Sequence, residues 1–441
     1  MLMKNSLVCR LSSYREIVKS HNIARKVITV ILLAIELVIC LAVGFDNLLM
    51  TMNQRTSILS FFLPSGVVLS ITYYIVSPFF VLLYASIKER LSYKSLLHEI
   101  DTSITDMKKW LFSQKVQWAP YAGAVNYSTD HRIANMLEIG SALAGLDLST
   151  GERKKLNSVN EQLWSEKSNR GWYSRTLGKD IGEETVICTS WGLAYFKNKA
   201  IEEAEFFHSA LDNLWSAHSE CGWGLYVRKH PESECRTGNT FWALRTINYY
   251  LSHGYQGDQE SIREFIVDYY RKSKDGRFGF HLGDDDNLCA TAMFYVLYNE
   301  LDKKVKNEIK NYYNSKEVIE YILEKFCKDN TQCIEEDLPG TKKVDKVPWQ
   351  HITVSYALIA LSYAWRSKEL NMFQKTAVVK QIRTILAMNV QTSNTGRYYH
   401  PQGMSRCANH QSGGAYTYPS AHLIIGLHAI KKTIEKSKIT A

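Results

Sequence analysis

The sequence predicts an all-α protein, an (α/α)6 toroid preceded by an N-terminal two-helix transmembrane hairpin. Three observations lead to this prediction. Long apolar runs with very few charges fill much of the first ninety residues. Apolar helical segments that open at Thr or Ser recur from about residue 115 onward. Only 8 of the 441 residues are proline, against a usual share of about 5%, which is typical of a mostly helical chain.

The N-terminal part consists of a basic segment, residues 1–26, and two apolar runs, residues 27–45 and 58–87. A membrane-spanning helix needs about 20 predominantly apolar residues, so each run is long enough. A secretory signal peptide would be shorter, would end in small residues and would not be followed by a second apolar run. We therefore expect a retained hairpin over residues 27–87.

The basic residues predict the orientation of this hairpin. Lysines and arginines precede the first run and follow the second, whereas the loop between the runs offers only Arg55 against Asp46. Because basic residues stay on the cytoplasmic side, both ends of the hairpin and everything after it are expected in the cytoplasm, at the cell membrane.

The composition agrees with this location. The nine cysteines are odd in number and irregularly spaced, which we interpret as reduced thiols rather than a disulfide framework. Part of the net charge of +9 is explained by topology and by attraction to anionic lipid headgroups. Membrane lipids are therefore expected partners, and nucleic acid is not.

Glu36 lies in the middle of the first apolar run, where an ionised carboxylate is costly. One interpretation is a protonated glutamic acid bonded to Thr72 or Tyr73 of the second run. The other is a polar site in an oligomeric pore or interface, which implies a homo-oligomer formed through the hairpin.

After a linker helix over residues 88–114, the toroid domain is expected over residues 115–441. A Gly–aromatic turn, as at Gly171-Trp172 and Gly222-Trp223, precedes four of the apolar helices, and the earliest helix lacks it. The first three intervals between helix openings are 51, 51 and 62 residues, and the last is 67. The predicted openings are Thr189, Thr240, Thr291, Thr353 and Ser420, and an earlier helix starts near His131.

Amphipathic segments with one apolar side lie between these apolar helices. Helices that are apolar on most of their surface belong inside, and helices with one wet face belong outside. Six such pairs close a ring, and the Thr and Ser residues are predicted as N-caps at one rim.

The Gly–aromatic turns before Thr-opened helices cover about residues 115–435, and this layout resembles the terpene-cyclase and protein-prenyltransferase toroid superfamily. The resemblance implies a central cavity that takes an isoprenoid or a similar lipid. It does not fix an activity, because other (α/α)6 barrels act on glycans.

Asp284, Asp285 and Asp286 stand together just before the helix that contains Thr291. Mutual repulsion favours a proton on one of these carboxyls, which would then be a general acid in an apolar cavity. The stretch looks like the D-x-D-D motif of class II terpene cyclases, which implies Asp286 as proton donor. Asn287 replaces the last acid of that motif, and the chain has room for one toroid instead of two. The alternative is a solvated acidic turn or N-cap.

Aromatic residues of the inner helices are candidates for the cavity wall, where their π faces would stabilise carbocations. Ordinary core packing is the alternative, and for the turn tryptophans we favour a role in joining inner to outer helices. The residues expected to line the cavity are Trp191, Trp242, Tyr295, Tyr356 and His351.

The protein-prenyltransferase branch binds zinc through an Asp-x-Cys pair and a distant His, and no repeat here supplies that pair. Scattered thiols and imidazoles near the inner-helix starts are more simply small buried side chains, so no metal or other cofactor is expected. They are Cys188, Cys235, Cys289, His351, Cys407 and His410. The acidic pairs Glu183-Glu184 and Glu232/Glu234 leave glycan cleavage as a weaker alternative.

Two functions remain open. In the first, the chain is a membrane-anchored toroid that binds an isoprenoid or lipid-like ligand and, if it is an enzyme, transforms it. In the second, the toroid is a non-catalytic sensor or scaffold, and the hairpin is its membrane effector in stress or antiviral defence.

Overall fold

The computed structural model describes residues 77–113, 121–122, 132–173, 183–228, 234–327, 350–387, 390–392, 397–399 and 415–439. The chain divides into two compact units, Met1–Ser95 and Leu96–Ala441. The second unit is built almost entirely from helices.

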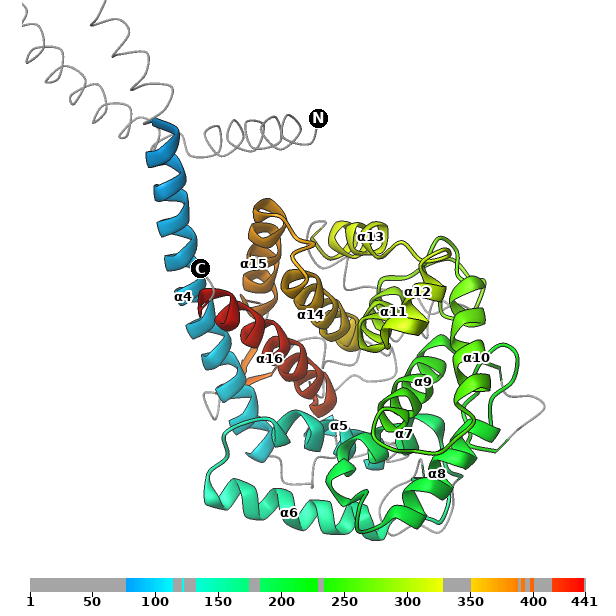
Figure 1. The fold of residues 1–441 in the computed structure, drawn as a ribbon. Helices are drawn as coiled ribbons and strands as arrows, with labels where there is room; N and C mark the ends of the chain where they lie inside the picture. Colours follow the sequence, from blue (N-terminus) through cyan, green and yellow to red (C-terminus); the bar gives the residue numbers. More distant parts are fainter. Residues whose placement is uncertain are drawn as a thin grey trace, which may run out of the picture. The chain divides into compact units, whose positions relative to one another are not determined.

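Six helices of the described part form an inner ring. Each packs against the next in chain order, and the last packs against the first, so the ring is closed (Figure 1). This arrangement confirms the predicted helical toroid. The six helices are α5 (Arg132–Ala144), α7 (Val186–Tyr195), α9 (Thr237–Leu251), α11 (Leu288–Glu300), α14 (Gln350–Arg366) and α16 (Thr417–Ile439).

Outer helices pack around this ring: α6 lies against α5, α8 against α7 and α9, and α13 against α11, α14 and α15. α10 packs on α12. The outer helices are α6 (Thr150–Ser165), α8 (Ala204–Ser216), α10 (Gln259–Arg271), α12 (Lys303–Ile309), α13 (Ser315–Cys327) and α15 (Met372–Ala387).

Burial separates the two sets of helices as their apolar patterns predict. α11 buries every residue from Ala290 to Leu297, so it has no wet face. α10 buries one stripe, which includes Ile262, Ile266 and Tyr270, and leaves its other side polar. Apolar burial of about 25 cal/mol per Å² therefore holds the ring together from both sides of each inner helix.

α4 (Ser77–Ser113) is a single helix of 37 residues. It runs without interruption through residues 87 and 88, where the sequence predicts the end of the second span. Within the second unit its C-terminal part joins the toroid, since Lys108 Nζ lies 3.2 Å from Glu152 Oε2 of α6.

In the described part of the chain, no helix combines the length and the apolar character that crossing a membrane requires. The first predicted span, residues 27–45 with Glu36, lies outside the described residues, as do Thr72 and Tyr73.

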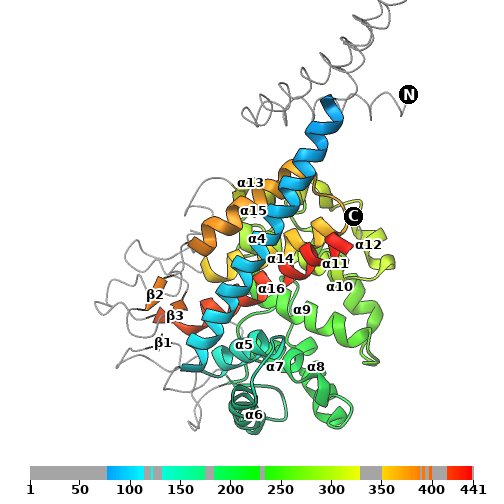
Figure 2. The same cartoon turned by 90° about the vertical axis from the view of Figure 1, so that its left-hand side faces the viewer.

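Two short antiparallel ladders accompany the helices. β1 (Tyr121–Ala122) pairs with β4 (Ala415–Tyr416), and β2 (Val390–Thr392) pairs with β3 (Arg397–Tyr399) (Figure 2). The first ladder joins the segment before α5 to the segment before α16, at the place where the ring closes.

The predicted N-caps are wrong, because α7, α9, α11, α14 and α16 each begin three residues before the Thr or Ser that was expected to open them. Thr185 and Asn287 are the caps of α7 and α11, and they accept hydrogen bonds from the Cys188 and Ala290 N–H groups. α9 and α16 begin with polar or small residues, Thr237-Gly238-Asn239 and Thr417, whereas α7 and α11 begin with apolar residues, Val186 and Leu288, that precede the predicted openings.

The threonines inside the helices bind the Gly–aromatic turns instead. Thr189 and Thr240 Oγ1 accept the backbone N–H of Trp172 and Trp223, at 3.1 and 3.0 Å. Thr291 accepts the N–H of the corresponding Phe278 at 3.1 Å. The same contact therefore recurs at the starts of three successive inner helices.

The indole of each turn tryptophan reaches the outer helix. Trp172 Nε1 donates to the Leu163 carbonyl oxygen at 2.9 Å, and Trp223 Nε1 donates to that of Leu214 at 2.6 Å. Gly222 has φ +111°, and a side chain on it would overlap Thr240 Oγ1, so the turn requires glycine. Each turn thus links one outer helix to the next inner helix.

Cys221 and Cys235 form a disulfide, with their Cα atoms 5.9 Å apart. The interpretation of all nine cysteines as reduced thiols is therefore wrong for this pair. The turn at Gly222 brings Cys221 to the start of α9, next to Cys235, and spacing along the sequence does not reveal that proximity.

Candidate functional site

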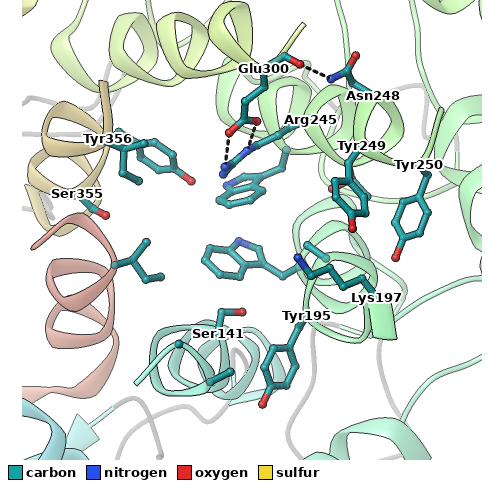
Figure 3. A pocket seen from close by; sticks show the side chains of 18 of the residues that line it. Ser141, Tyr195, Lys197, Arg245, Asn248, Tyr249, Tyr250, Glu300, Ser355 and Tyr356 are labelled. Carbon is teal, nitrogen blue, oxygen red and sulfur yellow. Dashed lines mark hydrogen bonds and ion pairs between the residues drawn. The ribbon is translucent and has the colours of Figure 1, made fainter. Parts of the chain in front are cut away.

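The inner ring encloses a cavity of about 670 Å³. Side chains from different helices, among them Tyr356, Arg245, Lys197 and Ser141, surround one space (Figure 3). All six inner helices contribute to the wall, through residues that include Ser141, Trp191, Trp242, Glu300, Tyr356 and His422.

The exposed fractions of the lining residues distinguish the closed inner part of the cavity, here called the floor, from its opening, here called the mouth. Trp191, Trp242 and Tyr356 are 5%, 8% and 2% exposed, whereas the lining residues Lys197 and Ser252 are exposed. The exposed residues follow the C-terminal ends of α7 and α9. The cavity therefore opens at that end of these helices.

The floor of the cavity is aromatic. The ring centroids of Trp191 and Trp242 lie 4.4 Å apart, and Tyr356 lies 6.0 Å from Trp242 at a steep angle. Burial raises the pKa of Tyr356 well above its usual value, so its hydroxyl stays protonated. Such faces suit an apolar or weakly cationic group.

His422 of α16 stands in this wall, edge-on to Trp191 at 5.6 Å between ring centroids. Its Nε2 lies 3.2 Å from Glu138 Oε1 of α5, and both side chains are nearly fully buried. This contact joins α16 to α5 across the closure of the ring.

Arg245 and Glu300 form a half-buried ion pair in the wall. Arg245 Nε and Nη2 each donate to a Glu300 carboxylate oxygen at 2.7 Å, and the Tyr363 hydroxyl donates to the same carboxylate at 3.0 Å. The guanidinium also lies 5.6 Å from the Trp242 ring centroid. Burial acts against the charge of Arg245, but the Glu300 carboxylate outweighs it and raises the pKa of Arg245.

Of the residues predicted to line the cavity, Trp191, Trp242 and Tyr356 lie in its wall. Tyr295 does not, because it is completely buried and its hydroxyl donates to Glu369 at 2.8 Å. His351 belongs to the first turn of α14, and its side chain lies outside the described residues.

The acidic turn lies at the other end of α11 from Glu300, and none of its three aspartates lines the cavity. A helix of 13 residues separates its two ends by roughly 18 Å. Asp286 Oδ2 lies 3.2 Å from Arg277 Nη1, and Asp284 Oδ2 lies 3.2 Å from His281 Nδ1. Asp285 is exposed. A general acid must reach its substrate, so this position favours a structural role for the turn.

The other predicted groups do not converge in the part of the chain that the structure describes. Cys188 is buried and Cys235 is in the disulfide, while Cys407 and His410 lie outside the described residues. Among the described residues, no cluster of three or more metal-ligating side chains is found. Glu184 accepts the Ser168 hydroxyl at 2.7 Å, and Glu234 lies 3.6 Å from His281 Nε2.

The fold of this chain resembles that of a solved protein structure. The chain is similar in structure to a variant of the type II terpene cyclase MstE from Scytonema, which was solved in complex with its product merosterolic acid A. The identity is 13% and the TM-score 0.47, over 77% of this chain and 99% of that one. No protein-family model and no curated protein matches the sequence.

The sequence prediction missed several charged or titratable residues at the cavity: Lys197 in its lining, and, within the inner helices, the lining residues His422, Arg245 and Glu300 together with Glu138, which contacts His422. Each of the four within the helices interrupts or ends an otherwise apolar inner helix, which was an available signal. Register was another, because Trp191, Trp242 and His422 all lie two residues after the Thr or Ser of their repeat. Aligning the repeats at that residue would have placed His422 beside the tryptophans.

Proposed function

We propose that this protein binds an isoprenoid or a similar lipid-like ligand in the cavity of its toroid. The single observation that carries the proposal is the cavity of about 670 Å³ with Trp191, Trp242 and Tyr356 in its wall. Ligand sites are commonly concave spaces of about 300–1,000 Å³ lined by aromatic and apolar groups with a few polar ones. The Arg245–Glu300 pair and Ser141 supply such polar groups.

The proposal concerns binding first, and turnover is a separate step. For Asp286 to act as a general acid, its carboxyl would have to leave Arg277 and reach the ligand from the opposite end of α11. The position of the acidic turn therefore favours a toroid that holds its ligand without protonating it through Asp286. Binding without turnover is also what the alternative function, a non-catalytic toroid sensor, requires of this domain. Product analysis after incubation with a polyprenyl substrate, with Asp286→Ala as the comparison, tests the enzymatic version.

Anchoring is part of the same proposal and is supported by the sequence. Two apolar runs, residues 27–45 and 58–87, and the basic residues flanking them support a hairpin with the toroid on the cytoplasmic side, whereas the Cys221–Cys235 disulfide is of a kind that is rare in that compartment. Retention of the full chain in membranes after an alkaline carbonate wash supports the anchor, and release into the supernatant contradicts it.

The binding proposal is tested with farnesol and the purified full chain. We expect saturable quenching of tryptophan fluorescence and a single bound farnesol in native mass spectrometry. Trp191→Ala and Trp242→Ala should each raise the dissociation constant for farnesol about tenfold or more. A tenfold change corresponds to about 1.4 kcal/mol of binding free energy. Trp215→Ala is the matched control, because Trp215 lies on the outer helix α8. Absence of saturable binding, or equal loss in the control, would refute the proposal.

A further inference from the structure

The charges of the described cavity wall are few, and most are already paired. The Arg245 guanidinium and the Glu300 carboxylate share two hydrogen bonds of 2.7 Å, so together they add no net charge. His422 Nε2 lies 3.2 Å from Glu138 Oε1, and Glu138 is not among the residues that line the cavity. A ligand entering this cavity therefore meets one ion pair, Arg245–Glu300, that is neutralised internally.

Lys197 is different. It is exposed, it lines the cavity directly after α7, and its Nζ lies 5.3 Å from the Tyr249 ring centroid. Within the described part of the chain, Lys197 has no carboxylate within ion-pair distance. Its charge at the mouth is therefore not neutralised by the wall.

Arg245 adds donors without adding charge. Its Nε and Nη2 serve Glu300, whereas Nη1 has no hydrogen-bond partner among the described residues. The side chain keeps 29% of its surface accessible, and this surface faces the cavity, because Arg245 belongs to its lining. The site thus offers N–H donors from two residues but only one uncompensated positive charge.

We propose that the cavity selects an amphiphile with a single negative charge, an isoprenoid or lipid carboxylic acid. Its carboxylate pairs with Lys197 and Arg245 Nη1, and its apolar body lies against Trp191 and Trp242. A buried charge is costly unless it is paired. A diphosphate, with about three negative charges at neutral pH, exceeds the one cation available, and an uncharged alcohol leaves that cation unused. This inference rests on the proposed function and adds the headgroup to it.

Three probes of equal chain length test the selection: farnesoic acid, farnesol and farnesyl diphosphate, titrated separately into the purified full chain. We expect farnesoic acid to bind at least tenfold more tightly than either of the others. Lys197→Glu should remove this preference by weakening the binding of farnesoic acid at least tenfold. Lys199→Glu is the matched control, because Lys199 lies two residues away and outside the cavity lining, and it should retain the preference.

Glu300→Gln provides a test in the opposite direction. It frees the Arg245 charge, so farnesyl diphosphate should bind at least tenfold more tightly than to the wild type. Circular dichroism and the melting temperature verify that each variant is folded. If farnesol and the acid bind but the diphosphate binds the wild type as tightly as the acid, only the headgroup inference fails. It fails likewise if Lys197→Glu changes nothing. If none of the probes binds, the proposed function fails as well.

Discussion

The two ends of the inner helices use their polar groups for different purposes. At the N-terminal ends of α7, α9 and α11, threonine hydroxyls accept backbone N–H groups from the aromatic turns, as Thr240 does from Trp223. At the C-terminal ends of α7 and α9, the wall opens into the cavity, and Lys197 stands exposed. At the first end the threonine hydroxyls stabilise the turns, whereas at the second end Lys197 has no carboxylate within ion-pair distance among the described residues.

The acidic turn, residues 284–286, belongs to the N-terminal end of the inner helices. Asp284 and Asp286 lie just before the N-terminal end of α11. Asp284 contacts His281, and Asp286 forms an ion pair with Arg277. The three adjacent aspartates predicted as the acid site therefore lie at the end of the inner helices where polar groups stabilise the turns. The polar groups that line the cavity are single residues within the apolar helices, such as Arg245, or directly after them, such as Lys197.

The largest loss of stability is expected from a substitution at Gly222, in the turn at the N-terminal end of α9. Gly222→Ala combines a positive φ with an overlap on Thr240 Oγ1, and we expect a loss of about 4 kcal/mol in the free energy of unfolding. Gly254→Ala is the control, since Gly254 has φ +98° with open space around it, and it should cost about 1 kcal/mol. Urea denaturation measures both. Equal losses in the two variants would show that the contact with Thr240 does not stabilise the turn.

A smaller loss is expected at the cavity floor from Glu138→Ala. It leaves His422 without its buried partner, and removing one member of such a pair costs about 3 kcal/mol. The double variant Glu138→Leu with His422→Leu should recover part of this loss, because it leaves neither group unpaired. A double-mutant cycle from urea unfolding supplies the coupling energy. Strict additivity of the two single changes would mean that the pair contributes nothing.

The smallest effect is a pH dependence carried by buried tyrosines near the cavity. Burial raises the pKa of Tyr195 to about 12, and burial together with Glu300 raises the pKa of Tyr363 to about 12. The unfolded chain loses these protons near pH 10, while the folded chain keeps them until about pH 12. Stability is therefore full below pH 10 and is lost as the pH rises through 12, by about 1.4 kcal/mol per pH unit for each tyrosine.

Urea unfolding at a series of alkaline pH values measures that slope. Tyr195→Phe should make the slope shallower, because the variant has no hydroxyl proton to lose. Tyr312→Phe is the control, since Tyr312 is 42% exposed, and it should leave the slope as in the wild type. An unchanged slope in Tyr195→Phe would contradict the assignment.

The sequence alone determined the helical class, the division into inner and outer helices, and the Gly–aromatic turns. It could do so because these features depend on local periodicity and on a repeat that returns at nearly constant spacing. Trp191, Trp242 and Tyr356 were predictable for the same reason, since residues of an apolar inner helix must face either the core or the hollow.

Only the tertiary structure decided where the polar groups meet. The contact of Glu138 with His422 requires α16 to close on α5, and that of Arg245 with Glu300 requires α9 beside α11. The pairing of Cys221 with Cys235 requires the turn between them. Such contacts join residues far apart or across a turn, and their free energy depends on distance in space, which no spacing along the chain records.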